Sequence, residues 1–194
     1  MPHRLRVFHP PTLMFGALML AAVMLSASPL ASVADDHLVP SWMKVEKAAH
    51  LLRLSVISGW NANNGGLNYN GYYSGDMTVV VPPAWTVEID FKNNDAMLPH
   101  SLIVTKPYGV DEFPDQAGAD QAALPRAYTD NPEQGIPSPK TDTVRFATKD
   151  PGDFDFFCGA PGHGHGGMWT RLTVDAAAEA PYVVLAKDTE RGRE

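Results

Sequence analysis

Apolar side chains recur at every second residue in several short segments of this chain, and this spacing constrains its fold more than any other feature. The clearest case is 86–91, where Val87, Ile89 and Phe91 alternate with acidic residues. Successive side chains of a β-strand point to opposite faces, so this pattern is typical of a strand with one face in a core. Clusters of Gly, Pro and Asn separate such segments and predict turns. The predicted strands are 51–58, 77–81, 86–91, 101–105, 143–147, 152–158, 168–174 and 182–186.

Seven to eight short strands with turn signals between them predict an all-β fold, namely a β-sandwich of two packed sheets. Three segments depart from the pattern. Ser41 is a candidate N-cap for a short N-terminal helix at 42–50, and residues 61–75 are rich in turn-forming Asn and Gly. Residues 107–142 contain six prolines and little periodicity. A segment that long without regular structure is typical of an insertion or a functional loop, and we expect a short helix near 117–124 within it.

The first 34 residues have a different composition from the rest. Arg4 and Arg6 precede an uninterrupted apolar run of 14 residues at 12–25, and small residues follow as far as Ala34. This order is typical of a secretory signal peptide, and the run is shorter than the roughly 20 residues of a membrane span. The sequence therefore predicts a signal peptide at 1–34, cleaved after Ala34, and one exported domain at 35–194. Were it not cleaved, the same segment would anchor the protein to the membrane.

Charge and cysteine content narrow the classes of function. Without residues 1–34 the chain has 13 basic and 22 acidic residues, a formal charge of −9, and no cluster of Lys and Arg. Such a domain is a poor match for nucleic acid, and we expect no nucleic-acid partner. Exported proteins usually pair their cysteines, yet Cys158 is the only cysteine of the chain. Its thiol is therefore either a buried small side chain or a metal ligand.

The segment around Cys158 favours the metal. Residues 154–169 read FDFFCGAPGHGHGGMW, which places Cys158 at the end of a predicted strand and Met168 at the start of the next. The loop between them contains Cys158-x4-His163-x4-Met168, and His100 begins another predicted strand. A strand–loop–strand junction can gather such side chains around one point. Spacing alone does not separate His163 from His165, and Met168 by itself also fits a core position.

A thiolate, two imidazoles and a thioether suit one metal particularly well. Two His and one Cys in a plane, with a weak axial Met, form the blue copper arrangement. Thiolate and imidazole bind both oxidation states of copper, so little rearrangement is needed when an electron arrives. Four side chains also fill the coordination sphere. The sequence thus predicts one type 1 copper ion used for electron transfer and no catalytic residue.

Residues 51–174 resemble the cupredoxin superfamily, and most closely the sulfocyanin group, with rusticyanin as a relative that has the same loop spacing. The resemblance is carried by LNYNGYYSGDMTVVVPPAWTVEIDF, by LPHSLIV and by FFCGAPGHGHGGMW. It implies a cupredoxin-like Greek-key sandwich for the 35–194 domain. It also implies that the copper ligands are His100, Cys158, His163 and Met168, and that Ser101 lies near the thiolate sulfur, where hydrogen bonds tune a metal site. His165 is then expected on the exposed part of the loop.

The resemblance further implies an exported electron carrier, in the periplasm or at the outer face of the cytoplasmic membrane. Its partners would be redox proteins such as cytochromes or a terminal oxidase, which bind transiently to a monomer. We expect the docking patch around Met97, Leu98 and Pro161. Two alternatives stay open, a mononuclear copper enzyme and a copper-handling protein. With seven His in all, two of them in the signal segment, and one Cys, the chain lacks the ligands for a multicopper oxidase or a binuclear copper site.

Overall fold

The computed structural model describes residues 37–109 and 111–186. The predicted signal peptide lies outside these residues, so its cleavage and the domain boundary after Ala34 stay predictions. Among the described residues, no helix is long and apolar enough to cross a bilayer. The described chain folds into nine strands and three 3-10 turns.

The first sheet has four strands in the order β1-β2-β4-β6. Strands β2 and β4 run parallel, whereas the outer strands pair antiparallel with their neighbours. The four strands are β1 (Met43–Glu46), β2 (Leu51–Ser58), β4 (Thr86–Asn93) and β6 (Thr141–Ala147). In β4 the predicted alternation is realised, because Val87, Ile89 and Phe91 are buried in the core and Asp90 is exposed.

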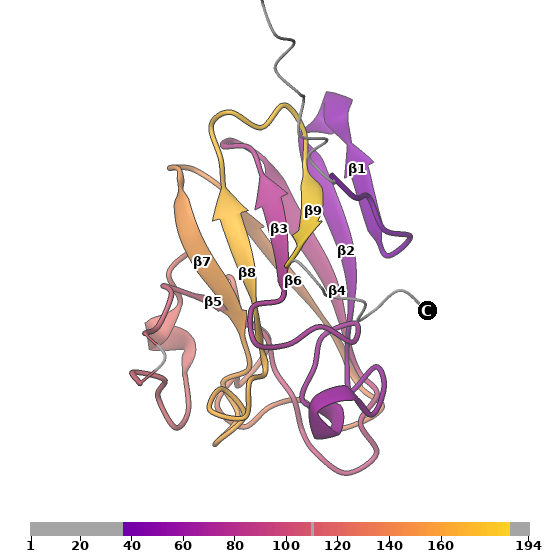
Figure 1. The fold of residues 1–194 in the computed structure, drawn as a ribbon, viewed down its shortest axis with the longest axis vertical. Helices are drawn as coiled ribbons and strands as arrows, with labels where there is room; N and C mark the ends of the chain where they lie inside the picture. The colour runs from indigo at the N-terminus through magenta and orange to yellow at the C-terminus, as the bar shows by residue number, and fades with distance from the viewer. Residues whose placement is uncertain (1–36, 110, 187–194) are drawn as a thin grey trace, which may run out of the picture. The chain divides into compact units, whose positions relative to one another are not determined.

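The second sheet has five strands in the order β5-β7-β8-β3-β9. Strand β3 runs parallel to β8 and antiparallel to β9, and β7 joins β5 and β8 in antiparallel pairs. Figure 1 shows this sheet in front of the first one. The five strands are β3 (Met77–Val81), β5 (Ile103–Thr105), β7 (Gly152–Phe157), β8 (Trp169–Val174) and β9 (Tyr182–Leu185). The predicted all-β sandwich is confirmed.

The helix predicted at 42–50 is wrong. Residues Met43–Glu46 form strand β1, and only the 3-10 turn Lys47–Ala49 follows it. Met43 pairs with Leu54 of β2 and is buried, while Lys44 is exposed. An isolated helix of nine residues is marginal in water, and pairing with the free edge of β2 supplies both hydrogen bonds and a place in the core. Tertiary pairing therefore overrides the local signal.

The long segment before β6 has little regular structure, as predicted. The expected helix near 117–124 is reduced to the 3-10 turn Ala119–Gln121, and β6 already begins at Thr141. The first part of the segment covers the outer face of the second sheet. Ala117, Tyr108 and Phe113 pack there against Ile103 and Phe157, in a small apolar cluster separate from the main core.

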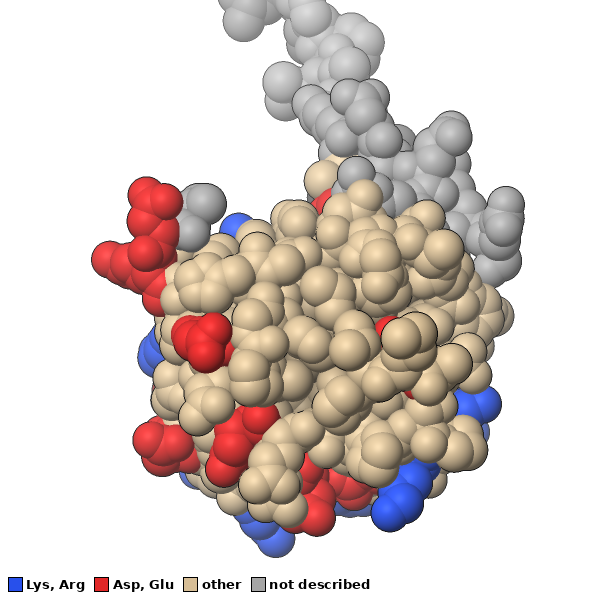
Figure 2. Space-filling model, turned by 90° about the horizontal axis from the view of Figure 1, so that it is seen from below, with Lys and Arg blue, Asp and Glu red and all other residues tan. Residues whose placement is uncertain are grey.

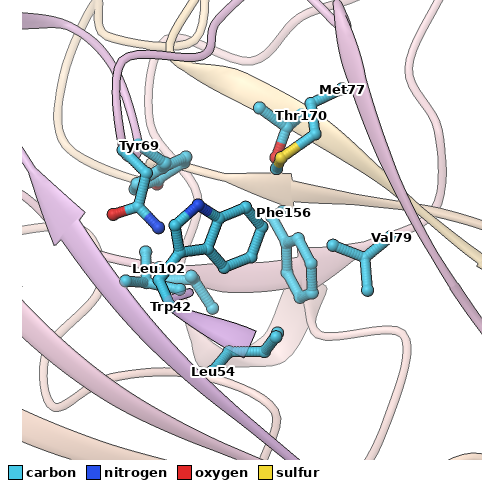
Figure 3. Close-up of a pocket in the computed structure, with 10 residues that line it drawn as sticks. Trp42, Leu54, Tyr69, Met77, Val79, Leu102, Phe156 and Thr170 are labelled. Atoms are coloured by element: carbon cyan, nitrogen blue, oxygen red, sulfur yellow. The ribbon is translucent and has the colours of Figure 1, made fainter. Parts of the chain in front are cut away.

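A small cavity of about 10 Å³ lies in the main core between the two sheets. Figure 3 shows Leu54, Val79, Leu102 and Phe156 among the side chains that surround it. Tyr69 also lines this cavity and donates a hydrogen bond from its hydroxyl to the carbonyl of Ser101 at 2.5 Å. The core thereby holds the backbone beside His100, where the candidate site begins.

Candidate metal centre

Three predicted ligands from two distant segments of the sequence meet at one end of the sandwich. The Nδ1 atoms of His100 and His163 lie 3.2 Å apart, and the Sγ atom of Cys158 lies 3.4 Å from His163 Nδ1. All three donor atoms lie within 4.8 Å of one another. In the described part of the chain, this is the one group of at least three His, Cys, Asp or Glu residues arranged to hold a metal ion.

Backbone hydrogen bonds fix the loop that contains two of these donors. Cys158 follows the last residue of β7, and its amide donates to the carbonyl of Met168 at 3.0 Å. The amide of Met168 donates in turn to the carbonyl of His163 at 2.9 Å, and the amide of His163 donates to Ala160 at 3.1 Å. The loop thus closes on itself between β7 and β8. These bonds link backbone groups only, so they leave the side chains of Cys158 and His163 available to a metal ion.

A different connection holds His100. Its amide donates to the carbonyl of Ile136 at 3.2 Å, and the amide of Ile136 returns a bond to the carbonyl of His100 at 2.7 Å. His100 is fully buried, whereas His163 is half-buried. Of the two imidazoles, only that of His163 therefore reaches toward solvent.

Burial keeps the two imidazoles neutral. Desolvation, with a contribution from the neighbouring His100, lowers the pKa of His163 to about 4. Desolvation also lowers the pKa of His100, although its contact with Asp95 acts in the opposite direction. At neutral pH both rings can thus offer a nitrogen lone pair to a metal ion. Burial raises the pKa of the Cys158 thiol, so a metal ion must displace the thiol proton when it binds.

Ser101 lies beside the sulfur atom, where the family resemblance expects it. The Ser101 amide points at Cys158 Sγ at 3.4 Å, and its hydroxyl oxygen lies 3.7 Å from the same atom. The hydroxyl is held by Gly159, whose amide donates to it at 2.9 Å, and itself donates to the carbonyl of Pro132 at 2.7 Å. Hydrogen bonds to a ligating sulfur stabilise its thiolate form and tune the metal.

The two other residues considered in the sequence analysis are Met168 and His165. Met168 is fully buried and its backbone closes the ligand loop, but its role as axial ligand stays a prediction. His165 is exposed and stands outside the three-residue group, which agrees with the choice of His163. Its ring contacts Phe113 edge-on with the centroids 6.4 Å apart.

Sequence reasoning missed Asp95. Its Oδ2 atom lies 3.0 Å from His100 Nε2, on the side of the ring opposite to the other two donors. Although burial alone would raise the pKa of Asp95, hydrogen bonds from the Met97 amide, His100 and the Leu98 amide bring it below its ordinary value. The Asn-Asn-Asp sequence at 93–95 reads as a turn, and nothing in it indicates contact with a ligand.

The donors present fit a copper ion. Two donors bound to one ion at about 2.0–2.3 Å, the range for imidazole and thiolate, are at most about 4.6 Å apart. The two separations that include His163, 3.2 and 3.4 Å, satisfy this limit, and all three donor atoms lie within 4.8 Å of one another. Two imidazoles and one thiolate are the equatorial set of a type 1 copper site. When bound, the copper ion would accept and release single electrons.

A two-sheet β-sandwich with this donor set defines a blue copper protein of the cupredoxin class. The chain belongs to the sulfocyanin family, because the family model described as the sulfocyanin (SoxE) domain matches residues 43–185. Sulfocyanin of Sulfolobus acidocaldarius is 27% identical over 135 residues, which cover 68% of this chain and 67% of that protein.

Solved structures of similar fold include auracyanins and rusticyanin. The reduced auracyanin of Roseiflexus castenholzii is 20% identical, with a TM-score of 0.44, and the match covers 63% of this chain and 96% of the other. Auracyanin A of Chloroflexus aurantiacus, a "blue" copper protein, is 19% identical with a TM-score of 0.45, and the match covers 64% of this chain and 99% of the other. Rusticyanin of Thiobacillus ferrooxidans is 17% identical with a TM-score of 0.40, and the match covers 69% of this chain and 86% of the other.

Proposed function

We propose that this protein carries single electrons between redox proteins through one type 1 copper ion held by His100, Cys158, His163 and Met168. The observation that carries the proposal is the convergence of two imidazole Nδ1 atoms and one thiol sulfur at a loop that is closed by its own backbone hydrogen bonds. Donors held by such a loop suit electron transfer, since this limits the rearrangement that accompanies a change in the charge of the metal.

The arrangement of the ligands favours electron transfer over catalysis on a bound substrate. His100, Cys158 and Met168 are fully buried, which leaves the half-buried His163 as the ligand nearest to solvent. With Met168 as the fourth ligand, no coordination position is left open for a substrate. We infer that electrons enter and leave by way of the His163 edge and that the protein is not an enzyme.

The surface around the ligand loop supports transient docking. Figure 2 views the molecule from the end where the loop between β7 and β8 lies, and the middle of this face is largely uncharged, with acidic side chains toward one side. Met97 is 90% exposed, and Leu98 and Pro161 are exposed as well. A small apolar patch with a charged rim suits short-lived complexes between redox proteins. The partners we propose are cytochromes or a terminal oxidase.

We further propose that the protein acts outside the cytoplasm as a monomer, either in the periplasm or at the outer face of the cytoplasmic membrane. The supporting feature is the signal-like sequence at 1–34. A copper electron carrier in that compartment exchanges electrons with partners on the same side of the membrane.

The first test is a visible spectrum of the full chain loaded with cupric ion, recorded before and after ascorbate. We expect an intense thiolate-to-copper band that ascorbate bleaches reversibly. The Cys158→Ser variant should lack the band. It should also bind copper more than about 100-fold more weakly, because loss of a residue that only hydrogen-bonds to a ligand already lowers metal affinity by about 10- to 100-fold. A weakly coloured wild-type protein with bound copper would contradict the proposal and favour an open, enzyme-like site.

Docking through Met97 is tested by electron self-exchange between two copies of the copper-loaded protein. Met97→Glu brings like charges together at the contact, so the exchange rate should fall about tenfold at low salt while the visible spectrum stays the same. Val39→Glu is the matched control, since Val39 is an exposed apolar residue (61%) in the segment that pairs with β9. Equal slowing in both variants would show that total charge, and not this patch, controls the rate.

A further inference from the structure

One carboxylate links the ligand His100 to the exposed turn at the copper end. Asp95 Oδ2 pairs with His100 Nε2 at 3.0 Å, while Asp95 Oδ1 accepts hydrogen bonds from the amides of Met97 and Leu98 at 2.8 and 3.1 Å. The Asp95 side chain is only 14% exposed. Both of its oxygens are therefore engaged, one by the ligand and one by the turn.

The surrounding chain holds this carboxylate in place. The amide of Asp95 donates to Asn93 Oδ1 at 2.9 Å, and Asn93 Nδ2 donates to the carbonyl of Leu98 at 2.8 Å, which closes the turn. On the other side, a Cβ atom at Gly66 would lie 2.8 Å from Asp95 Oδ2, and one at Gly59 would lie 2.8 Å from Asp95 Cβ. Glycine at both positions thus leaves the space that the Asp95 side chain occupies.

The contact with Asp95 determines which nitrogen of His100 has a free lone pair for a metal ion. A neutral imidazole has one N–H donor and one lone-pair acceptor. Because an ionised carboxylate only accepts, His100 must carry its proton on Nε2, and Nδ1 is left to face His163 Nδ1 and Cys158 Sγ. A carboxylate bonded in this way also makes a histidine a stronger electron donor to its metal. Stronger donation favours the more highly charged, oxidised form of copper.

We propose that Asp95 is a positioning residue that holds His100 in its Nδ1-binding form and that its negative charge lowers the reduction potential of the bound copper. The effect on the reduction potential rests on the proposed function, whereas the positioning of His100 does not. The competing explanation is that Asp95 serves the turn alone, through its Oδ1 atom. The two explanations differ in what happens to His100 and to the potential.

The first experiment compares midpoint potentials and copper affinities of the full chain in three variants. Asp95→Asn removes the charge and keeps a side chain that can accept from the turn, whereas Asp95→Ala removes both. Both should raise the potential, and Asp95→Ala should weaken copper binding by about 10- to 100-fold. Asp150→Asn is the control, because this exposed residue lies before β7, at the end opposite to Cys158. A potential that is the same in Asp95→Asn and Asp150→Asn would overturn the role of the charge.

The second experiment needs no copper. Nitrogen-15 NMR of the metal-free full chain reports the protonation of each imidazole nitrogen, and wild-type His100 should carry its proton on Nε2. Gly66→Ala should disturb this state by displacing Asp95 Oδ2. Gly65→Ala should not, since a Cβ atom there meets nothing within 4 Å although both glycines have positive φ. An unchanged His100 signal in Asp95→Ala would overturn the positioning role, whether or not the wild-type protein proves to be blue.

Discussion

The two faces of strand β7 are both buried, yet they differ in chemistry and in what covers them. Phe154, Phe156 and Cys158 point into the main core between the sheets. Asp155 and Phe157 point the other way and are no more exposed, at 1% and 0%. One face is uniformly apolar until it ends in Cys158, the proposed copper ligand, whereas the other pairs a carboxyl group with an aromatic ring.

The long segment before β6 explains why the outer face is buried. The rings of Tyr108 and Phe113 lie 5.2 and 6.0 Å from the ring of Phe157. The same segment reaches the ligand loop, because the amide of Ala117 donates to the carbonyl of Gly159 at 3.0 Å and the amide of Gly162 donates to the carbonyl of Asp115 at 2.7 Å. The segment therefore supports the copper loop from outside while the core supports it from inside.

The outer face of the second sheet has more buried polar atoms without a hydrogen-bond partner than the inner face. Asp155 Oδ1 and Thr105 Oγ1 are buried there without a hydrogen-bond partner, against Thr170 Oγ1 alone on the inner face, and the Arg171 guanidinium lies 3.6 Å from Asp155 Oδ1. Burial raises the pKa of Asp155 to about 6, against the opposing effect of Arg171. The comparison teaches that a long connecting segment can add a second small core to a sheet, but that it also buries a carboxyl oxygen without a hydrogen-bond partner.

The largest expected effect tests whether the outer face is a true core. Phe157→Ala and Phe156→Ala should each lower the free energy of unfolding of the metal-free protein by about 3–5 kcal/mol, since each removes a buried aromatic ring. Denaturant titration of the two variants side by side measures this. A loss below about 1 kcal/mol for Phe157→Ala alone would mean that the segment is only a loose cover.

The next effect tests the polar group. Asp155 has a folded pKa near 6, above its ordinary value of 3.8, so its ionisation destabilises the fold as pH rises through this interval. Asp155→Asn should be more stable than wild type by about 2–3 kcal/mol at pH 7, and the difference should vanish near pH 4. The measurement is the free energy of unfolding as a function of pH. Asp150→Asn, a change at an exposed residue just before the same strand, is the control and should keep the wild-type slope.

A smaller effect measures how directly the segment before β6 contacts β7. In a double-mutant cycle, Phe113→Ala and Phe157→Ala should be coupled by about 0.5–1.5 kcal/mol, because their rings are stacked at an interplanar angle of 14°. Unfolding titrations of the two single variants and the double variant give the coupling. Additive effects would show that the two rings are buried independently.

The smallest effect concerns Arg171, which lies over the ring of Trp169 at 5.0 Å and is 45% exposed. Arg171→Gln should cost about 0.5–1 kcal/mol through loss of the cation–π contact. It should also raise the pKa of Asp155, because Arg171 is the charge that opposes its burial. The fall in stability should still begin near the ordinary pKa of 3.8, but the pH at which it levels off should move upward. An unchanged pH profile would show that Arg171 does not affect the pKa of Asp155.

Much of the fold was predictable because local patterns and tertiary packing agreed. Strand β2 forms over 51–58 as its alternation predicts, and β3 over 77–81. The failure at 42–50 has a physical reason, since β1 exists only through its pairing with β2, a partner that no local pattern reveals. The burial of Asp155 was equally hidden. A carboxyl group between two phenylalanines reads as a solvent-facing position until an insertion covers it.

The sequence by itself indicated most of the strands and, through the family resemblance, the candidate ligands of the copper site. Spacing places Cys158, His163 and Met168 within one loop, although it does not by itself separate His163 from His165. Tertiary structure decided that Nδ1 of His100 faces His163 while Nε2 meets Asp95, and it decided that the segment before β6 forms a second small core on β7. These outcomes depend on contacts between segments far apart in the chain, and such contacts exist only once the sheets have packed.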